Sequence, residues 1–320
     1  MNFQALLLLC LVAGAQPGFA QTEETTSSWS RKAIFDLDSK NLNNPRKSIF
    51  WAPVASYLLP GINQYINDQN RAGALYSALA VTGLMTASQA SQRIQGRVEN
   101  PRDIVNLEER DSDVRAYLWG MKTYDLAGSL SLYHTFRTAV NFRKGRGDYS
   151  FLPEGERVDE LMLAPFQFSF LTRWSTLIPL GIGLGLVIGV SANDDYNTRS
   201  LDGEDVLFTG AISYNAGVGE EALFRGWMMP LFRESFGNSF WSNIATSTLF
   251  AAAHISSENP YPVAQFVAGY YLGWLTLQNN WTLSESIFVH TWWDIIIFAA
   301  NFSQGDRKAS IYVPIYQTQF

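Results

Sequence analysis

Ionisable side chains are rare in the C-terminal third of this 320-residue chain, and several of them are concentrated in three short motifs. Only eight of the 99 residues from 206 to 304 are Asp, Glu, Lys or Arg. The motifs are Glu220-Glu221-Ala222-Leu223-Phe224-Arg225, Phe250-Ala251-Ala252-Ala253-His254 and His290-Thr291-Trp292-Trp293-Asp294. Charged groups in membrane-like apolar runs are costly and usually carry function. The three motifs are therefore the candidate site of this protein.

The first motif predicts one braced carboxylate and one reactive carboxylate. On a helix, Glu221 and Arg225 are four residues apart with the acid first, which is the favourable order for an ion pair. Glu220 points about 100° away from Glu221 and is left without a charged partner. Such a carboxylate in a poorly solvated site is expected to have a raised pKa, as a general base near neutrality needs. Glu220 is the candidate base, with Glu221 and Arg225 as its structural support; alternatively, all three form a charge network that fixes helix packing.

The second and third motifs supply two of the three histidines of the chain. His254 follows small alanines that allow close approach of a helix or substrate, and Phe250, one turn earlier, is expected to pack. His290 and Asp294 lie four residues apart, so the carboxylate can fix the tautomer of the imidazole. Each motif alone also fits a structural role, His254 as a satisfied core residue and His290 with Asp294 as a buried pair.

Taken together, Glu-Glu-x3-Arg, Phe-x3-His and His-x3-Asp on successive apolar helices resemble the CPBP family. This family comprises type II CAAX prenyl proteases and bacteriocin-processing membrane proteases and is related to the Ras-converting enzyme. The resemblance, over roughly residues 170–304, implies an intramembrane endopeptidase in which Glu220 and His254 activate a water. It also implies that His290 and Asp294 support the oxyanion. The family often has Asn at the last position, and an ionised Asp cannot donate a hydrogen bond. Asp294 is thus expected to be protonated or to orient His290.

The same residues admit a metal ion. Glu220, His254 and His290 could bind zinc with a water in the fourth position. The chain lacks the compact His-Glu-x2-His helix that is usual in zinc proteases. Its only cysteine is Cys10, which argues against a cysteine-based zinc site and a disulfide framework. By the resemblance we favour a mechanism without a metal or another cofactor, with zinc as the alternative.

The elements that position these motifs are predicted to be helices of a polytopic transmembrane bundle, an all-α fold with a polar N-terminal extension. Residues 174–192 carry no charge and are the clearest candidate span. Within them Gly181, Gly185 and Gly189 recur every four residues, which predicts a small-residue face packed against a neighbouring helix. Only helices or closed barrels cross lipid, and these runs do not alternate as barrel strands do. The apolar runs that lead into or carry the motifs are 206–218, 235–253, 261–277 and 286–302.

The N-terminal half is predicted to contain a leader and two membrane-associated helices. Residues 1–20 have the apolar core and small terminal residue of a secretory signal peptide. Residues 72–92 carry no charge and suit one membrane helix. Residues 116–140 are aromatic and mixed, and suit a membrane-surface or re-entrant helix. The predicted parts are the signal peptide (1–20), the N-terminal extension (21–157), a CPBP-like intramembrane protease domain (158–305) and a C-terminal tail (306–320).

These observations predict an integral membrane enzyme in a bacterial inner membrane. The net charge of −6 without a basic stripe argues against nucleic acid as a partner. The leading hypothesis is an intramembrane endopeptidase that cleaves a membrane-embedded or lipidated protein in the bilayer with a glutamate-activated water. The alternatives are a non-catalytic membrane protein with an immunity or chaperone-like role, and a transporter with a proton relay. A protease needs Glu220, His254 and His290 to converge on one site, whereas a relay needs them along a path.

Overall fold

Every regular element in the described part of the chain is helical, which confirms the all-α prediction. The computed structural model describes residues 48–97, 111–144, 147–153, 156–191, 200–256 and 259–303. The predicted signal peptide (1–20) and C-terminal tail (306–320) lie outside them. The α-helices are α2 (Trp51–Leu58), α3 (Ile62–Ile66), α4 (Asn70–Arg97), α5 (Ser112–Lys144), α6 (Val158–Leu163), α7 (Trp174–Ser191), α8 (Gly203–Leu223), α9 (Met229–Phe236), α10 (Ser239–Ala252), α11 (Val263–Gln278) and α12 (Ser284–Ser303).

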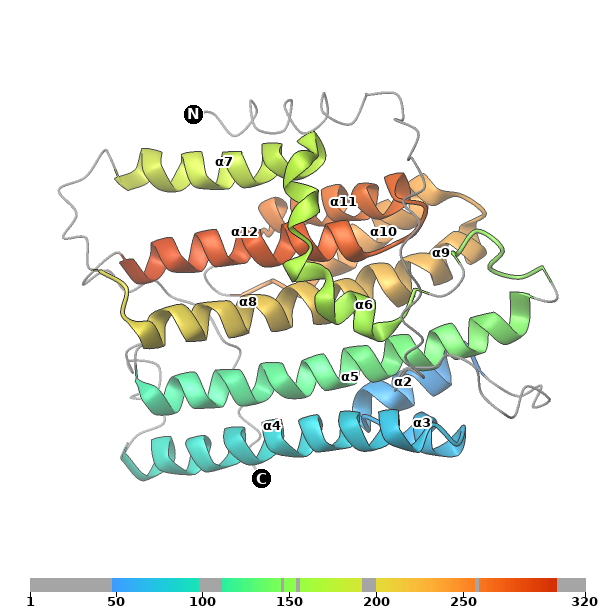
Figure 1. Ribbon diagram of the computed structural model, residues 1–320, viewed down its shortest axis with the longest axis horizontal. Coiled ribbons are helices and arrows are strands. Elements are labelled where there is room, and N and C mark those ends of the chain that lie inside the picture. The colour runs from blue at the N-terminus through green and yellow to red at the C-terminus, as the bar shows by residue number, and fades with distance from the viewer. Residues whose placement is uncertain are drawn as a thin grey trace.

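The long helices lie side by side in the order α4, α5, α8, α12 and α7 (Figure 1). On the other side of the motif helices, α10 packs against α9 and α11, and α11 also contacts α12. The first motif ends α8, the second ends α10 and the third lies on α12. Helices that pack together therefore carry the three motifs.

The N-terminal half packs into the same core as the motif helices. One cluster of buried side chains joins Tyr76 of α4, Leu130 of α5 and Val218 of α8. Helix α5 is continuous over 33 residues, and its residues 126–140 are all buried. The prediction of a membrane-surface or re-entrant helix at 116–140 is therefore wrong, because α5 is covered by α4 on one side and by α8 on another. The predicted extension and protease domain share one core.

No helix within the described residues is both long enough and apolar enough to cross a membrane. Residues 72–92 and 174–191, from the two stretches that were predicted as spans, lie in α4 and α7. They are helical as predicted, but they do not meet that requirement. The Ser, Thr and Gln side chains of α4 lower its mean hydropathy.

The face of α7 that meets α12 is not the predicted one. A Cβ added at Gly181, Gly185 or Gly189 would meet no described atom within 4 Å, so the prediction that these glycines pack against a neighbour is wrong. Gly183 packs instead, because a Cβ there would lie 3.0 Å from the Trp293 ring of α12. Two residues correspond to about 200° of helix rotation, which places Gly183 on the opposite face from Gly181 and Gly185.

Helices α8 and α12 approach closely beside the motifs. Gly217 lies against Thr291, whose backbone nitrogen would be 2.9 Å from a Cβ at position 217. The start of α8 is fixed by Asp202, whose side chain accepts a hydrogen bond from the Asp205 backbone at 2.8 Å. After Leu223, the chain continues in a π-helical turn, η4 (Phe224–Met228). Such turns are frequent at functional sites, and this one follows the first motif directly.

A buried carboxyl group ties the segment before α6 to α5 and to the residue that precedes α12. Glu156 is 5% exposed, and its Oε1 accepts a hydrogen bond from the Leu283 backbone at 2.6 Å. Its Oε2 accepts a hydrogen bond from the Tyr133 hydroxyl of α5 at 3.2 Å. Burial raises the pKa of Glu156 from 4.5 to about 7. This group therefore makes the stability of the fold depend on pH.

Candidate active site

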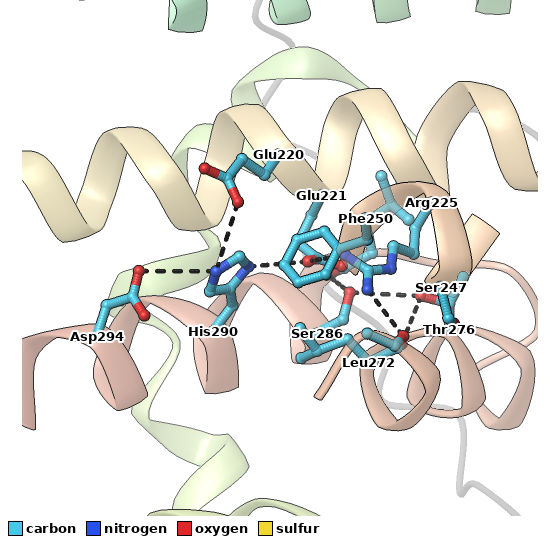
Figure 2. A network of polar contacts seen from close by, with 12 residues as sticks. Glu220, Glu221, Arg225, Ser247, Phe250, Leu272, Thr276, Ser286, His290 and Asp294 are labelled. Atoms are coloured by element: carbon cyan, nitrogen blue, oxygen red, sulfur yellow. Dashed lines mark hydrogen bonds and ion pairs between the residues drawn. The ribbon is translucent and has the colours of Figure 1, made fainter. Parts of the chain in front are cut away.

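Glu220, His254 and His290 meet at one place between α8, the end of α10 and α12. Oε2 of Glu220 lies 3.9 Å from Nε2 of His254 and 3.9 Å from Nε2 of His290. Asp294, one turn after His290, places its Oδ2 3.6 Å from the same Nε2 (Figure 2). The structure thus brings together the four residues that were given a catalytic role from the sequence. Polar separations of this length leave room for a bridging water.

The second glutamate of the first motif braces the site. Oε1 of Glu221 accepts hydrogen bonds from Nη1 of Arg225 at 2.6 Å and from Nδ1 of His290 at 2.9 Å (Figure 2). The side chains of Glu221 and Arg225 are both 0% exposed. Arg225 also donates from Nη2 to the Gly269 carbonyl of α11 at 2.8 Å. The predicted ion pair between Glu221 and Arg225 is present. Glu221 also has a role that was not predicted, because it binds the imidazole of His290 directly.

Hydrogen bonds fix the tautomer of both imidazoles. Nδ1 of His254 lies 2.7 Å from the Phe250 carbonyl oxygen, which can only accept, so Nδ1 carries the hydrogen. The same holds for His290, because its Nδ1 faces the ion-paired carboxylate of Glu221. In the neutral form, Nε2 of each ring is therefore an acceptor directed at Glu220. His290 can donate to an oxyanion from Nε2 only as an imidazolium, which the surrounding carboxylates stabilise.

Phe250 packs among the charged groups of the site, as expected. Its ring centroid lies 4.7 Å from that of His254 and 5.9 Å from that of His290. Cζ of Arg225 lies 4.5 Å from the centroid of the same ring, in cation–π contact. A single buried aromatic ring thus fixes both imidazoles and the guanidinium of the brace.

Lys122 of α5 is a site residue that the sequence analysis missed. Its Nζ donates to Oε1 of Glu220 at 3.2 Å. The prediction that Glu220 has no charged partner is therefore wrong, and the reason for expecting a raised pKa there no longer holds. The sequence contains a signal for this residue, since Lys122 and Asp125 are the only Asp, Glu, Lys or Arg residues from 116 to 136.

The catalytic candidates and Lys122 line a cavity of about 940 Å³. Cavities that bind small molecules have volumes of about 300–1,000 Å³ and are lined mainly by apolar side chains. The walls of this cavity come from α5, α7, α8, α10, α11 and α12. Its apolar lining includes Ile178, Ile182, Leu186, Phe208, Ile212, Ile297 and Phe298. The polar groups therefore act at the wall of a large apolar space.

No group of three or more His, Cys, Asp or Glu among the described residues is arranged to hold a metal ion. Ligand atoms of a tetrahedral zinc lie about 2.0–2.1 Å from the metal and hence about 3.3 Å from one another. The 3.9 Å separations between Glu220 and the two histidines are wider than this. Zinc bound by Glu220, His254 and His290 stays an alternative that chelation can test.

Fold and site together define a helical bundle with a glutamate and two histidines on an apolar cavity. Residues 203–296 match the family model described as type II CAAX prenyl endopeptidase Rce1-like. The matched segment runs from the start of α8 into α12, contains all three motifs and is consistent with the CPBP family. Members of the matched family are membrane proteins. Neither the curated proteins nor the solved structures contain a match to this chain.

Proposed function

We propose that this protein is an endopeptidase in which Glu220 activates a water for attack on a peptide bond. The observation that supports this most is the position of the Glu220 carboxylate, which faces two imidazole nitrogens at the wall of an apolar cavity. The match of this segment to an endopeptidase family agrees with it. A proton relay would need the same groups along a path, and their clustering at one point favours hydrolysis.

In the proposed reaction, a water between Glu220 and His254 gives a proton to Oε2 of Glu220 as its oxygen attacks the peptide carbonyl carbon. The carbonyl oxygen becomes an oxyanion, which the His290 imidazolium stabilises by donating from Nε2. Glu220 then passes its proton to the leaving nitrogen, and the C–N bond breaks. Asp294 orients His290 and balances its charge. The proposal uses no metal and no other cofactor.

We propose a membrane-embedded or lipidated protein as the substrate, and the lipid bilayer of a bacterial inner membrane as the location. The apolar lining of the cavity suits such a substrate. Large apolar side chains are exposed at the surface, among them Trp51, Trp174 and Tyr261 at 70%, 76% and 83%. In the proposed location these side chains would lie against lipid.

Substrate trapping in membranes tests the proposed function. Cells that produce the wild-type chain, Glu220→Gln or Glu234→Gln are compared for new peptide termini and for proteins captured with the chain. Glu234 lies on the exposed side of α9, so Glu234→Gln is the matched control for loss of a carboxylate. Wild type and control are expected to produce the same new termini, and Glu220→Gln is expected to retain the uncut substrate. The same new termini in Glu220→Gln would refute the assignment of the base, and capture without cleavage by wild type would indicate a non-catalytic binding role.

A further inference from the structure

We propose that Lys122 is a positioning residue of this site and that its charge balances both Glu220 and Asp294. The inference rests on the proposed function, because Lys122 acts through the catalytic carboxylate. Lys122 belongs to α5, which lies outside the segment 203–296 that matches the family model. The N-terminal half would thereby contribute directly to the chemistry.

The first ground is that the two carboxylate oxygens of Glu220 face different partners. Nζ of Lys122 holds Oε1 at 3.2 Å, whereas both imidazole Nε2 atoms face Oε2 at 3.9 Å. The lysine therefore fixes the rotation of the carboxylate and leaves the other oxygen directed at the place of the reacting water. A base must be held within hydrogen-bond reach of the proton that it abstracts.

The second ground is the charge of the cavity wall. Among the described residues that line the cavity, Lys122 is the one lysine or arginine, whereas Asp125, Glu220 and Asp294 are carboxylates. Arg225 of the first motif is already ion-paired with Glu221 behind the site. Asp125 lies one turn after Lys122 and accepts a hydrogen bond from the Tyr57 hydroxyl at 3.4 Å. The charge of Lys122 thus acts first on Glu220, and also on Asp125 and on Asp294.

This charge balance predicts that the effects of substituting Lys122 and Asp294 depend on each other. Without Lys122, Glu220 and Asp294 face the same imidazole with no lysine or arginine on the described cavity wall. Like charges at one site oppose the ionised form of each, so Glu220 loses the form in which it accepts a proton. Asp294→Asn removes one of the two charges and should therefore suppress the effect of losing Lys122. A lysine that served only to pack α5 against α8 would show no such suppression.

The test compares wild type with Lys122→Met, Lys122→Arg, Asp294→Asn and the double variant Lys122→Met/Asp294→Asn. The probe is a quenched fluorescent peptide with a farnesylated cysteine, in liposomes of phosphatidylethanolamine and phosphatidylglycerol. Lys122→Met is expected to lower kcat about 10²-fold with little change in KM, as loss of an electrostatic group at a reacting centre does. Lys122→Arg keeps the charge and should retain most of the rate. The double variant should be at least about tenfold faster than Lys122→Met, because only one carboxylate is left unbalanced.

The control is Arg93→Met, which removes the cation of an exposed pair with Asp113 far along α4. It should leave kcat unchanged. Wild-type kcat in Lys122→Met, or a double variant no faster than Lys122→Met, would overturn the proposal.

Thermal unfolding separates this proposal from the proposed function. If the wild-type chain cleaves none of the probe, the proposed function fails for that probe while the charge balance stays measurable. Lys122→Met is then expected to lower the melting temperature, and Asp294→Asn is expected to restore part of it in the Lys122→Met background. Purely additive effects of the two substitutions on the melting temperature would refute the balance between these residues.

Discussion

Replacing Arg225 with Met tests the brace beneath the site. The guanidinium donates to Glu221 at 2.6 Å and to the Gly269 carbonyl at 2.8 Å, and both partners of the ion pair are 0% exposed. Methionine fills much of the same volume but leaves the Glu221 carboxylate buried without its cation. Breaking a buried pair by removing one partner costs about 3–5 kcal/mol. We expect a loss of that size in the free energy of unfolding, measured by chemical denaturation with the protein kept in detergent micelles or lipid.

Two further variants test whether the loss of stability comes from the unpaired carboxylate of Glu221. Arg93→Met removes the cation of a pair in which the arginine is 53% exposed, and should cost about 0.2–1 kcal/mol. The double variant Arg225→Met/Glu221→Leu leaves no unpaired carboxylate and should be more stable than Arg225→Met. A loss below about 1 kcal/mol in Arg225→Met, as for an exposed pair, would show that Arg225 is not a brace.

Four further outcomes are expected. Asp294→Asn should keep activity because an amide can donate a hydrogen bond to the oxyanion, whereas Asp294→Ala should lower kcat. Wild-type rates in both variants would show that the side chain has no part in the reaction. Chelators should leave the rate of cleavage unchanged. A loss of activity that added zinc restores would instead support the mechanism in which zinc is bound. Gly217→Ala forces a Cβ against Thr291 and should cost about 1–3 kcal/mol, whereas Gly181→Ala should be neutral or slightly stabilising in the same denaturation assay. Because the pKa of Glu156 is raised to about 7 in the folded protein, its stabilising contribution is complete below about pH 4.5 and is lost as pH rises through 7. Glu156→Gln should remove this part of the pH dependence of the free energy of unfolding. An unchanged dependence on pH in Glu156→Gln would contradict the assignment.

The sequence was informative where spacing along one helix decides the geometry. The separation of four residues places Glu221 beside Arg225 and His290 beside Asp294, and both proximities are present in the structure. The order of the motifs also indicated that residues far apart in the chain belong to one site. These relations are local or repeat a known pattern, so they can be derived without knowing how the helices pack.

The remaining features depend on which helix faces which. Lys122 reaches Glu220 across 98 positions of the chain, and no periodicity within α5 predicts that contact. The glycine repeat of α7 suggested a packing face, but Trp293 packs on Gly183 from the other side. Likewise, the bond between Glu221 and His290 joins two motifs that were each interpreted alone. Long-range packing therefore decided the partner of the catalytic carboxylate and the face of α7.

The central claim is that Glu220 is the base that activates water, and the turnover of Glu220→Gln tests it most directly. Wild type, Glu220→Gln and the surface control Glu234→Gln are assayed on a substrate identified by trapping, after equal melting temperatures show that all three are folded. Glutamine keeps the shape of the side chain but cannot accept the proton, so the rate should fall by about 10²–10⁴-fold in Glu220→Gln alone. A rate within a few-fold of wild type in folded Glu220→Gln would contradict the mechanism.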